Sequence, residues 1–446
     1  MGRRRRTMFI GAVAAVVLVA GVSTVSAEVL TLEQCIQIAL ERDGSQAYGL
    51  PLARAGYHEA GQGIWSAWGG LLPTLSHGYG YQYQKLPSTS IYDPTTGQFV
   101  GSAGGSSSAW STNFSLNHEL FDGGANAYRV ALAYHNRAAQ RERLRGTENA
   151  LIFGVKSGYF GLLKADRLVA VEDAAVRRAE QFHKTIQSKY ELGSASLSEV
   201  LKAKVQLGSV QLELLRRQNE VEKARAQLNT VLNRPVDEPL EIADVGDAEP
   251  DVPPYEEALA RAMKAAPDVL AARASLRAAK DDVGIARATF FPTFSWGLTR
   301  SFTPERRDDL LKFDGRDGTW SARASLSFAL FNAFHYKTAL SNARVNLKYT
   351  RESVDQTERA TALAVKEQHL GVQLASEARR LADETEASAQ EDFNLAQEKY
   401  NLGAATILDL LDAQVSLTQA QTDKVNALFD YYVAVAGLEN AMGGGQ

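Results

Sequence analysis

The same ordered set of sequence markers occurs twice in this chain. Lys-Tyr-Glu-Leu-Gly at 189–193 recurs as Lys-Tyr-Asn-Leu-Gly at 399–403, an offset of 210 residues. The same offset relates Trp110 to Trp320 and Phe121 to Phe331. Self-similarity on this scale is typical of a repeated architecture, and it limits the chain to folds that accommodate both copies. We therefore predict an internal two-fold duplication.

The boundaries of the two copies follow from these markers. A first structural repeat is expected over residues 28–233 and a second over 255–442, each with one helix, two strands and two long helices. Residues 234–254 contain five prolines and many acids, so they are predicted to be an irregular linker. The tail is 443–446. Single first helices are expected over 32–68 and 255–289.

Four segments alternate apolar and polar residues with a period of two. They run over 75–84, 110–120, 294–302 and 320–330. Runs of 9–11 residues with this alternation fit tilted membrane-spanning strands that have an apolar outside and a polar lumen. Soluble hairpins packed on helices would show the same alternation and remain an alternative. Aromatic side chains near the strand ends are predicted to form a membrane girdle: Trp110, Phe121, Trp296, Trp320 and Phe331.

Long helices are the second constraint on the fold. Residues 125–191 contain no proline, and apolar side chains recur at helical spacing. The second copy repeats this pattern from about 333 to 401, and shorter helices are expected over 197–233 and 408–442. A helix of ~67 residues is ~100 Å long. Such helices bury their apolar stripes in extended helical pairs rather than in a compact domain.

The N-terminus indicates export. Four arginines precede an apolar stretch that ends in small residues at 25–27, so residues 1–27 are predicted to be a cleaved signal peptide. Without them the formal charge falls from -4 to -8. An acidic chain of this kind argues against nucleic acid as a partner. Cys35 is the single cysteine, so no internal disulfide is expected, and it is predicted to be buried on an apolar helix face.

Four strands cannot close a barrel in a membrane, because free strand edges would leave backbone polar groups unpaired in lipid. The chain must therefore oligomerise or pair with another protein. Three copies would contribute twelve strands, an even number within the usual range for barrels. The sequence alone does not determine the number of subunits.

The duplicated layout resembles the TolC-type outer-membrane factors. The resemblance rests on Leu-Pro-Thr-Leu-Ser at 72–76, Phe-Pro-Thr-Phe-Ser at 291–295 and the two Lys-Tyr-x-Leu-Gly segments, and it covers nearly the whole mature chain. It implies an α+β membrane protein in the outer membrane of a Gram-negative bacterium. Long antiparallel helical hairpins would form a periplasmic α-barrel, and a homotrimer would form a 12-strand β-barrel. It also implies docking to a periplasmic adaptor protein and an inner-membrane transporter, without a cofactor.

Asp409 and Asp412 match two acids that line the periplasmic constriction in this family. Their spacing of three residues places both carboxylates on one helix face. In a trimer, the resemblance implies a ring of six acids that attracts cations, with mutual repulsion raising some of the pKa values. Two solvated surface acids are the alternative.

The resemblance also implies a latch between the two tips of the helical hairpins. Glu199 matches an acid that accepts a hydrogen bond from a tyrosine, and Tyr400 matches that tyrosine. Ala405 stands where a family member has an arginine, so one polar link of the latch is missing. A packing role alone for Tyr400 remains open. The exposed tips are expected to dock the adaptor through Leu192, Gly193, Ser194, Leu197, Leu402, Gly403 and Ala404.

The sequence gives no sign of an enzyme. It contains no His-Glu-x-x-His segment, no Gly-x-Ser-x-Gly segment and no phosphate-binding loop. The expected function is a trimeric exit duct for a tripartite efflux pump or a type I secretion system, and the cargo is left open. The competing interpretation is a periplasmic or secreted coiled-coil structural protein without a pore.

Overall fold

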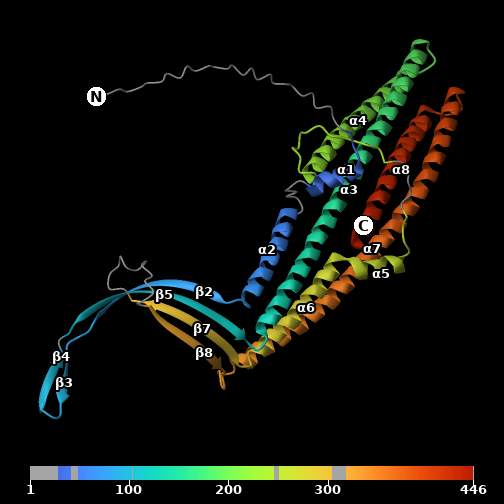
Figure 1. Ribbon diagram of the computed structural model, residues 1–446. Coiled ribbons are helices and arrows are strands. Elements are labelled where there is room, and N and C mark those ends of the chain that lie inside the picture. The colour runs from blue at the N-terminus through green and yellow to red at the C-terminus, as the bar shows by residue number, and fades with distance from the viewer. Residues whose placement is uncertain (1–28, 42–48, 103, 246–250, 304–317, 445–446) are drawn as a thin grey trace, which may run out of the picture.

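The chain folds into an elongated molecule with a β-sheet at one end and long helical hairpins at the other (Figure 1). The structure is a computed structural model, and it describes residues 29–41, 49–102, 104–245, 251–303 and 318–444. The predicted signal peptide therefore lies outside the described residues. No helix in these ranges has the length and hydropathy needed to cross a bilayer.

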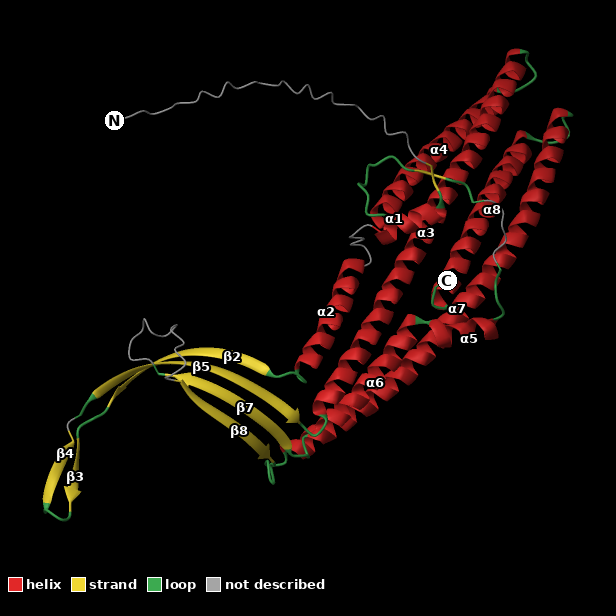
Figure 2. Ribbon diagram, in the orientation of Figure 1, coloured by secondary structure: helices red, strands yellow, loops and turns green. Residues whose placement is uncertain are grey.

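The sheet has four antiparallel strands in the order β2-β5-β7-β8. It is strongly curved in Figure 2. All four predicted strands are present, and β2 and β8 lie at its two edges. The strands are β2 (Thr74–Lys85), β5 (Ser106–Phe121), β7 (Thr293–Phe302) and β8 (Gly318–Ser327).

The pairing register brings the alternating side chains of all four strands into alignment. Leu116 of β5 lies opposite Leu75 and Leu298. Ser115, one residue earlier, lies opposite Ser76 and Thr299. Since neighbouring residues of a strand point to opposite faces, one face of the sheet is mainly apolar and the other carries small polar residues. The alternation predicted from the sequence is thus one continuous two-faced surface.

Strand β8 is shorter than predicted. It ends at Ser327, opposite Thr293, which is the first residue of β7, so no partner remains for the residues that follow. Phe331 therefore does not end a strand but lies in the turn before α7, where its side chain is 76% exposed. An additional hairpin, β3 (Thr89–Asp93) and β4 (Gln98–Ser102), extends the loop between β2 and β5.

The two long helices have the same length. Helix α3 (Ala125–Glu191) and helix α7 (His335–Asn401) each contain 67 residues. Each pairs with a 35-residue helix, α4 (Leu197–Val231) or α8 (Ile407–Ala441). Every boundary of the second pair lies 210 residues after that of the first. The predicted bounds of α3 are confirmed, and the other three helices agree within two residues.

The two shorter helical segments are each divided, contrary to the prediction of single helices. The first comprises α1 (Leu32–Glu41) and α2 (Leu50–Gly69), with residues 42–48 outside the described ranges. The second comprises α5 (Tyr255–Ala265) and α6 (Pro267–Ala288). Ala266 is extended, with φ −61° and ψ 125°, because a residue before proline is disfavoured in the helical region.

A hydrophobic core surrounds the middle of α3. Fully buried Cys35 lies in it, as predicted. The predicted irregular linker contributes β6 (Glu241–Ile242), which pairs in parallel with β1 (Val29–Leu30). The Tyr159 hydroxyl donates to the carbonyl of Ala243 at 2.5 Å, which fixes the linker to α3. Burial raises the pKa of Tyr159 to about 12, with further contributions from neighbouring acidic groups.

Candidate gate and docking site at the helical tips

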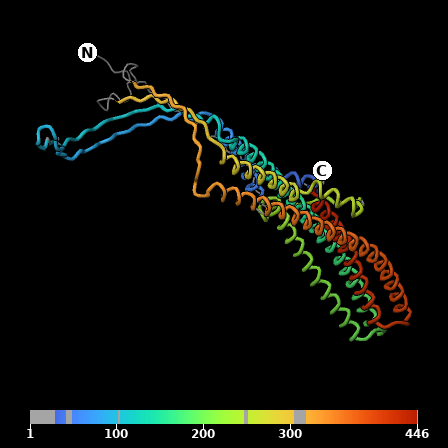
Figure 3. The backbone as a smooth tube through the Cα atoms, turned by 90° about the horizontal axis from the view of Figure 1, so that it is seen from below, coloured from blue at the N-terminus to red at the C-terminus, as the bar shows by residue number. Residues whose placement is uncertain are grey.

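The candidate site lies at the end of the molecule farthest from the sheet. The turn between α3 and α4 and the turn between α7 and α8 both lie at this end (Figures 1 and 3). All predicted gate and docking residues belong to these two turns or to the helix ends next to them. The structure therefore places them in one region, although 210 residues of chain separate the two turns.

Both turns are built in the same way. Gly193 has φ +79° and Gly403 has φ +74°, a left-handed conformation that glycine adopts without a steric penalty. Gly193 N–H donates to Tyr190 O and Ser194 N–H donates to Lys189 O, each at 2.8 Å. Gly403 and Ala404 repeat the pair of bonds. These bonds satisfy carbonyl groups at the helix ends and fix the direction in which the returning helix leaves.

Each returning helix begins with a reciprocal cap, which is absent from the expectations based on the sequence. In the first tip, Ser196 N–H donates to Glu199 Oε2 at 2.6 Å, and Glu199 N–H donates to Ser196 Oγ. In the second tip, Thr406 N–H donates to Asp409 Oδ2 at 2.8 Å, and Asp409 N–H donates to Thr406 Oγ1. The signal is visible in the sequence, since Ser or Thr followed three residues later by an acid indicates a helix start.

Asp409 is therefore both a candidate gate residue and part of the cap formed with Thr406 at the start of α8. Hydrogen bonds from the Thr406 backbone and hydroxyl lower the pKa of Asp409. This direction is opposite to that expected for crowded acids in a ring. Asp412 lies three residues further along α8, and both acids are exposed. Within the described residues neither acid forms an ion pair, and Asp409 accepts hydrogen bonds from the Thr406 backbone and hydroxyl.

The structure does not form the predicted hydrogen bond between Tyr400 and Glu199 within the described residues. The Glu199 carboxylate is already engaged by the backbone of Ser196. Burial, and then the negative charge of Glu199, raise the pKa of Tyr400. The Tyr400 hydroxyl thus forms no hydrogen bond to Glu199 in the part of the chain that the structure describes.

The ring of Tyr400 joins the tips by packing instead. It meets the Phe182 ring of α3 edge to face, with centroids 5.9 Å apart. The ammonium group of Lys189 lies 4.8 Å from the centre of the same ring. Tyr400 also packs against a small buried cluster of Ile186, Val200 and Ala203. The second hairpin thus inserts one aromatic side chain into the hydrophobic centre of the first.

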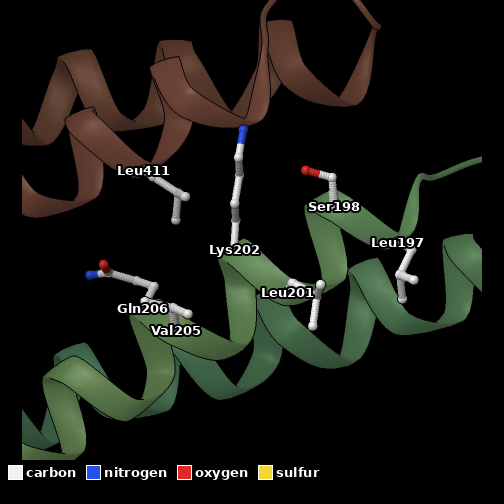
Figure 4. A pocket seen from close by; sticks show the side chains of 7 residues that line it. All are labelled: Leu197, Ser198, Leu201, Lys202, Val205, Gln206 and Leu411. Atoms are coloured by element: carbon white, nitrogen blue, oxygen red, sulfur yellow. The ribbon is translucent and has the colours of Figure 1, made fainter.

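A groove of about 560 Å³ separates α4 from α8 near the tips (Figure 4). Its lining is mainly aliphatic, and Lys202 extends from α4 towards α8 across it. The lining residues are Leu197, Ser198, Leu201, Lys202, Val205, Gln206 and Leu411. Only Leu197 among them was predicted as a docking residue. At the turns, the predicted docking residues Leu192 and Leu402 are each 84% exposed.

Polar links between the hairpins continue along α3 and α8. Arg178 donates from Nη2 to Thr418 Oγ1 at 3.2 Å and to Gln421 Oε1 at 3.3 Å. Burial lowers the pKa of Arg178, and the charge of Glu172 opposes this effect. Further along, Lys164 pairs with Asp430 at 3.0 Å. These links depend on helices far apart in sequence, so no local pattern predicted them.

The predicted girdle residues lie towards both ends of the sheet. At the end away from the helices, the Trp110 ring is 4.5 Å from Tyr81, and Trp320 lies opposite Arg300. Towards the helical end, Phe121 lies opposite Phe294, and Trp296 lies opposite His118. Phe331 is close to this end as well, in the turn after β8, where it contacts Phe334.

Comparison with known protein families gives a direct match over most of the chain. The family described as outer membrane efflux protein matches residues 53–234 and 258–444. The chain belongs to this family. Its members are transport channels rather than enzymes, and the chain is accordingly an outer-membrane efflux channel. The alternative of a coiled-coil structural protein without a pore has no support among the relatives.

Named relatives agree with the family match. The chain is 24% identical to the outer membrane efflux protein BepC of Brucella suis, over 97% of this chain and 90% of that one. It is 27% identical to the pyoverdine export outer membrane protein OpmQ of Pseudomonas aeruginosa, over 93% of this chain and 85% of OpmQ. It is 25% identical to the cation efflux system protein CusC of Escherichia coli, over 70% of this chain and 67% of CusC.

Solved structures share the fold. A crystal structure of CusC superposes with a TM-score of 0.78 at 20% identity, over 93% of this chain and 92% of that one. The outer membrane protein VceC of Vibrio cholerae gives 0.76 at 20% identity, over 93% and 96%. The solved structures thereby confirm the prediction of long helical hairpins combined with β-strands. The family match confirms the predicted location in the outer membrane.

Proposed function

We propose that three copies of this chain form a continuous tunnel that serves as the exit duct of a tripartite efflux pump. The observation that carries this proposal is the open sheet, whose edge strands β2 and β8 have no partner in the described chain. Unpaired edges are costly in lipid, so they require a neighbour. Strand β2 runs away from the helices and β8 runs towards them. Pairing β8 of one copy with β2 of the next would therefore continue the antiparallel order and close twelve strands.

Exposed apolar side chains on the long helices support assembly of the periplasmic part. Helix α4 exposes Leu201, Val205 and Leu212, and helix α7 exposes Leu363 and Leu374. Apolar stripes of this extent are unusual on a monomer in water. We infer that they pack between neighbouring copies, which would enclose a helical barrel. The equal lengths of α3 and α7 support an origin of the two halves by duplication.

Asp409 and Asp412 are proposed to ring the narrow end of this tunnel. Their exposure, their position on one helix face and the absence of an ion pair to either acid among the described residues support this role. The capping bonds to Thr406 keep Asp409 ionised at neutral pH. Three copies would then present six carboxylates to one pore. Tyr400 and Glu199 are proposed to keep the tips together, with the Tyr400 ring as the main contact.

The exposed turns are proposed to dock a periplasmic adaptor protein, which would link the channel to an inner-membrane transporter. The surface is formed by Leu192, Gly193, Ser194, Leu197, Leu402, Gly403 and Ala404. Its two halves are built alike, so six similar tips would face a partner in the trimer. The relatives named above export chemically different cargoes, which supports selection of the cargo by the transporter. The same duct would serve a type I secretion system.

Purification and reconstitution test the proposal. The mature chain extracted from outer membranes should need detergent, and its protein mass should be about three times that of one chain. Reconstituted in planar bilayers, it should conduct ions and prefer cations. Recovery as a monomer that is stable without detergent and shows no conductance would contradict both the barrel and the tunnel.

A further inference from the structure

Arg300 is a cation on the apolar register of the sheet. It lies opposite Phe114 on β5 and opposite Trp320 on β8. The other residues of β7 on this register are apolar: Phe294, Trp296, Leu298 and Phe302. In the proposed barrel this register faces lipid, where an arginine is costly in the middle of the membrane and much less so near the interface.

Aromatic rings hold the guanidinium group of Arg300 in place. Its central carbon is 4.6 Å from the centre of the Phe302 ring and 5.0 Å from that of Trp320. Gly318 makes room for this arrangement. A Cβ atom at position 318 would lie 2.6 Å from Cε1 of Phe302 and 3.0 Å from Nε of Arg300. Rings on two sides cover the guanidinium and leave other N–H groups to reach an acceptor.

No protein group neutralises this charge within the described residues. Arg300 forms no ion pair there, and its Nε is buried without a hydrogen-bond partner. Glu119 is the one acid in the four described strands, and it lies on the opposite register near the helical end of β5. A guanidinium that is held between two rings and has no ion-pair partner among the described residues is suited to binding an external anion, and phosphate matches its geometry.

The position of Arg300 points to one side of the membrane. It lies about 23 Å along β7 from Thr293, at ~3.3 Å per residue, and therefore close to the end farthest from the helices. A strand tilt of about 40° converts this to ~18 Å of height in an apolar band about 25 Å tall. Since the helices mark the periplasmic side, Arg300 lies towards the outer leaflet.

We propose that Arg300, Phe302 and Trp320 form a binding site for a phosphate group of a phosphorylated glycolipid in the outer leaflet. The proposal rests on the barrel proposed above, because that barrel makes this register face lipid. Arg300 would bind the phosphate through charge-assisted hydrogen bonds. Phe302 and Trp320 would hold the guanidinium at the depth of the lipid headgroups.

Binding of diphosphoryl lipid A to the purified trimer in neutral detergent tests the site. We expect Arg300→Gln to weaken binding about tenfold, because hydrogen bonds to a charged group are lost. Arg300→Lys should fall in between, since an ammonium group lacks the planar fork of guanidinium. Arg323→Gln is the matched control, because Arg323 lies on the opposite register of β8 and should bind lipid A as the wild type does.

Three outcomes would overturn the site. The first is equal lipid A affinity in the wild type and Arg300→Gln. The second is an equal loss in Arg323→Gln, which would indicate a general effect of charge. The third is saturation by inorganic phosphate without binding of lipid A, which would assign Arg300 to a soluble anion. Any of these results, obtained with an intact and conducting trimer, would contradict the lipid site but not the proposed channel. A monomer that is stable without detergent would contradict both the lipid site and the channel.

Discussion

Tyr400, one residue before the end of α7, packs edge to face against Phe182 of α3, with ring centroids 5.9 Å apart. This contact, with the Lys189 ammonium over the same ring, joins the second hairpin to the first near the tips. It replaces the expected hydrogen bond to Glu199, whose carboxylate caps α4 instead. In this structure the contact between the two tips is therefore aromatic packing, without a hydrogen bond between Tyr400 and Glu199 among the described residues.

Substitutions of Tyr400 separate these two kinds of contact. Tyr400→Phe should leave the conductance of the closed channel unchanged, since the hydroxyl does not join the tips. Tyr400→Ala removes the ring and should favour opening several-fold, because an aromatic pair contributes about 1 kcal/mol beyond its burial. Single-channel recording measures both. A large effect of Tyr400→Phe on the conductance would instead indicate that the hydroxyl holds the tips together.

The proposed acidic ring predicts a difference between its two acids. Asp409→Ala and Asp412→Ala should each reduce block by multivalent cations and raise conductance, and the double variant should do so most. Only Asp409→Ala should also speed amide exchange in the first turn of α8, because only Asp409 accepts hydrogen bonds from Thr406. Unchanged block by multivalent cations in the double variant would contradict the proposed ring of acids.

Cation block should persist to low pH. The capping bonds lower the pKa of Asp409 below its ordinary value of 3.8. Because the folded-state pKa of Asp409 is lowered, its hydrogen bonds stabilise the fold fully above the pKa of the unfolded state. This stabilisation is lost as the pH falls through the pKa of the folded state. Block and protection of the α8 start should thus be constant from about pH 8 to 5 and decline below about pH 4. A decline near pH 6 would mean that repulsion in the ring outweighs the caps.

The tip leucines should affect docking without affecting conduction. Leu192 and Leu402 are each 84% exposed, so replacing both by glutamate should leave the fold and the trimer intact. It should abolish export in cells, because charges at the centre of a contact surface must be desolvated. Growth under a pump substrate measures export, and planar bilayers measure conduction. Loss of both would indicate damage to the channel itself.

Tyr159 should control attachment of the linker. Tyr159→Phe removes the donor to the Ala243 carbonyl, leaving a partly buried acceptor unpaired at a cost of about 1–3 kcal/mol. We expect faster proteolysis near residues 241–243, with normal trimer mass and conductance. Arg167→Gln, at the exposed ion pair with Asp244, is the control and should change proteolysis little. Equal rates in Tyr159→Phe and the wild type would contradict the role of this bond.

The parts of the fold that depend on local pattern were predictable. The span of α3 from Ala125 to Glu191 follows from the absence of proline and from helical spacing. The register of the strands follows from alternation, because a slip of one residue would exchange the faces. Pro267 marks the break between α5 and α6, and Ser196 and Thr406 mark the caps. All three are local signals that can be recognised in the sequence.

Other parts depend on contacts between distant segments. Strand β8 ends at Ser327 because β7 begins at Thr293, and no pattern within β8 shows this. The engagement of Glu199 by Ser196 is local, whereas the packing of Tyr400 on Phe182 requires both hairpins to be in place. The isolation of Arg300 among apolar neighbours becomes apparent only when the register of β7 and β8 is known.

The equal lengths of α3 and α7 place a constraint on the gene as well as on the protein. One residue inserted into either helix would advance its tip by about 1.5 Å and turn it by ~100° relative to the other. Leu192 and Leu402 would then no longer present the same face at the same depth. Insertions and deletions in these two 67-residue segments should therefore be tolerated only as matched changes, whereas the loops beyond the sheet can vary in length independently.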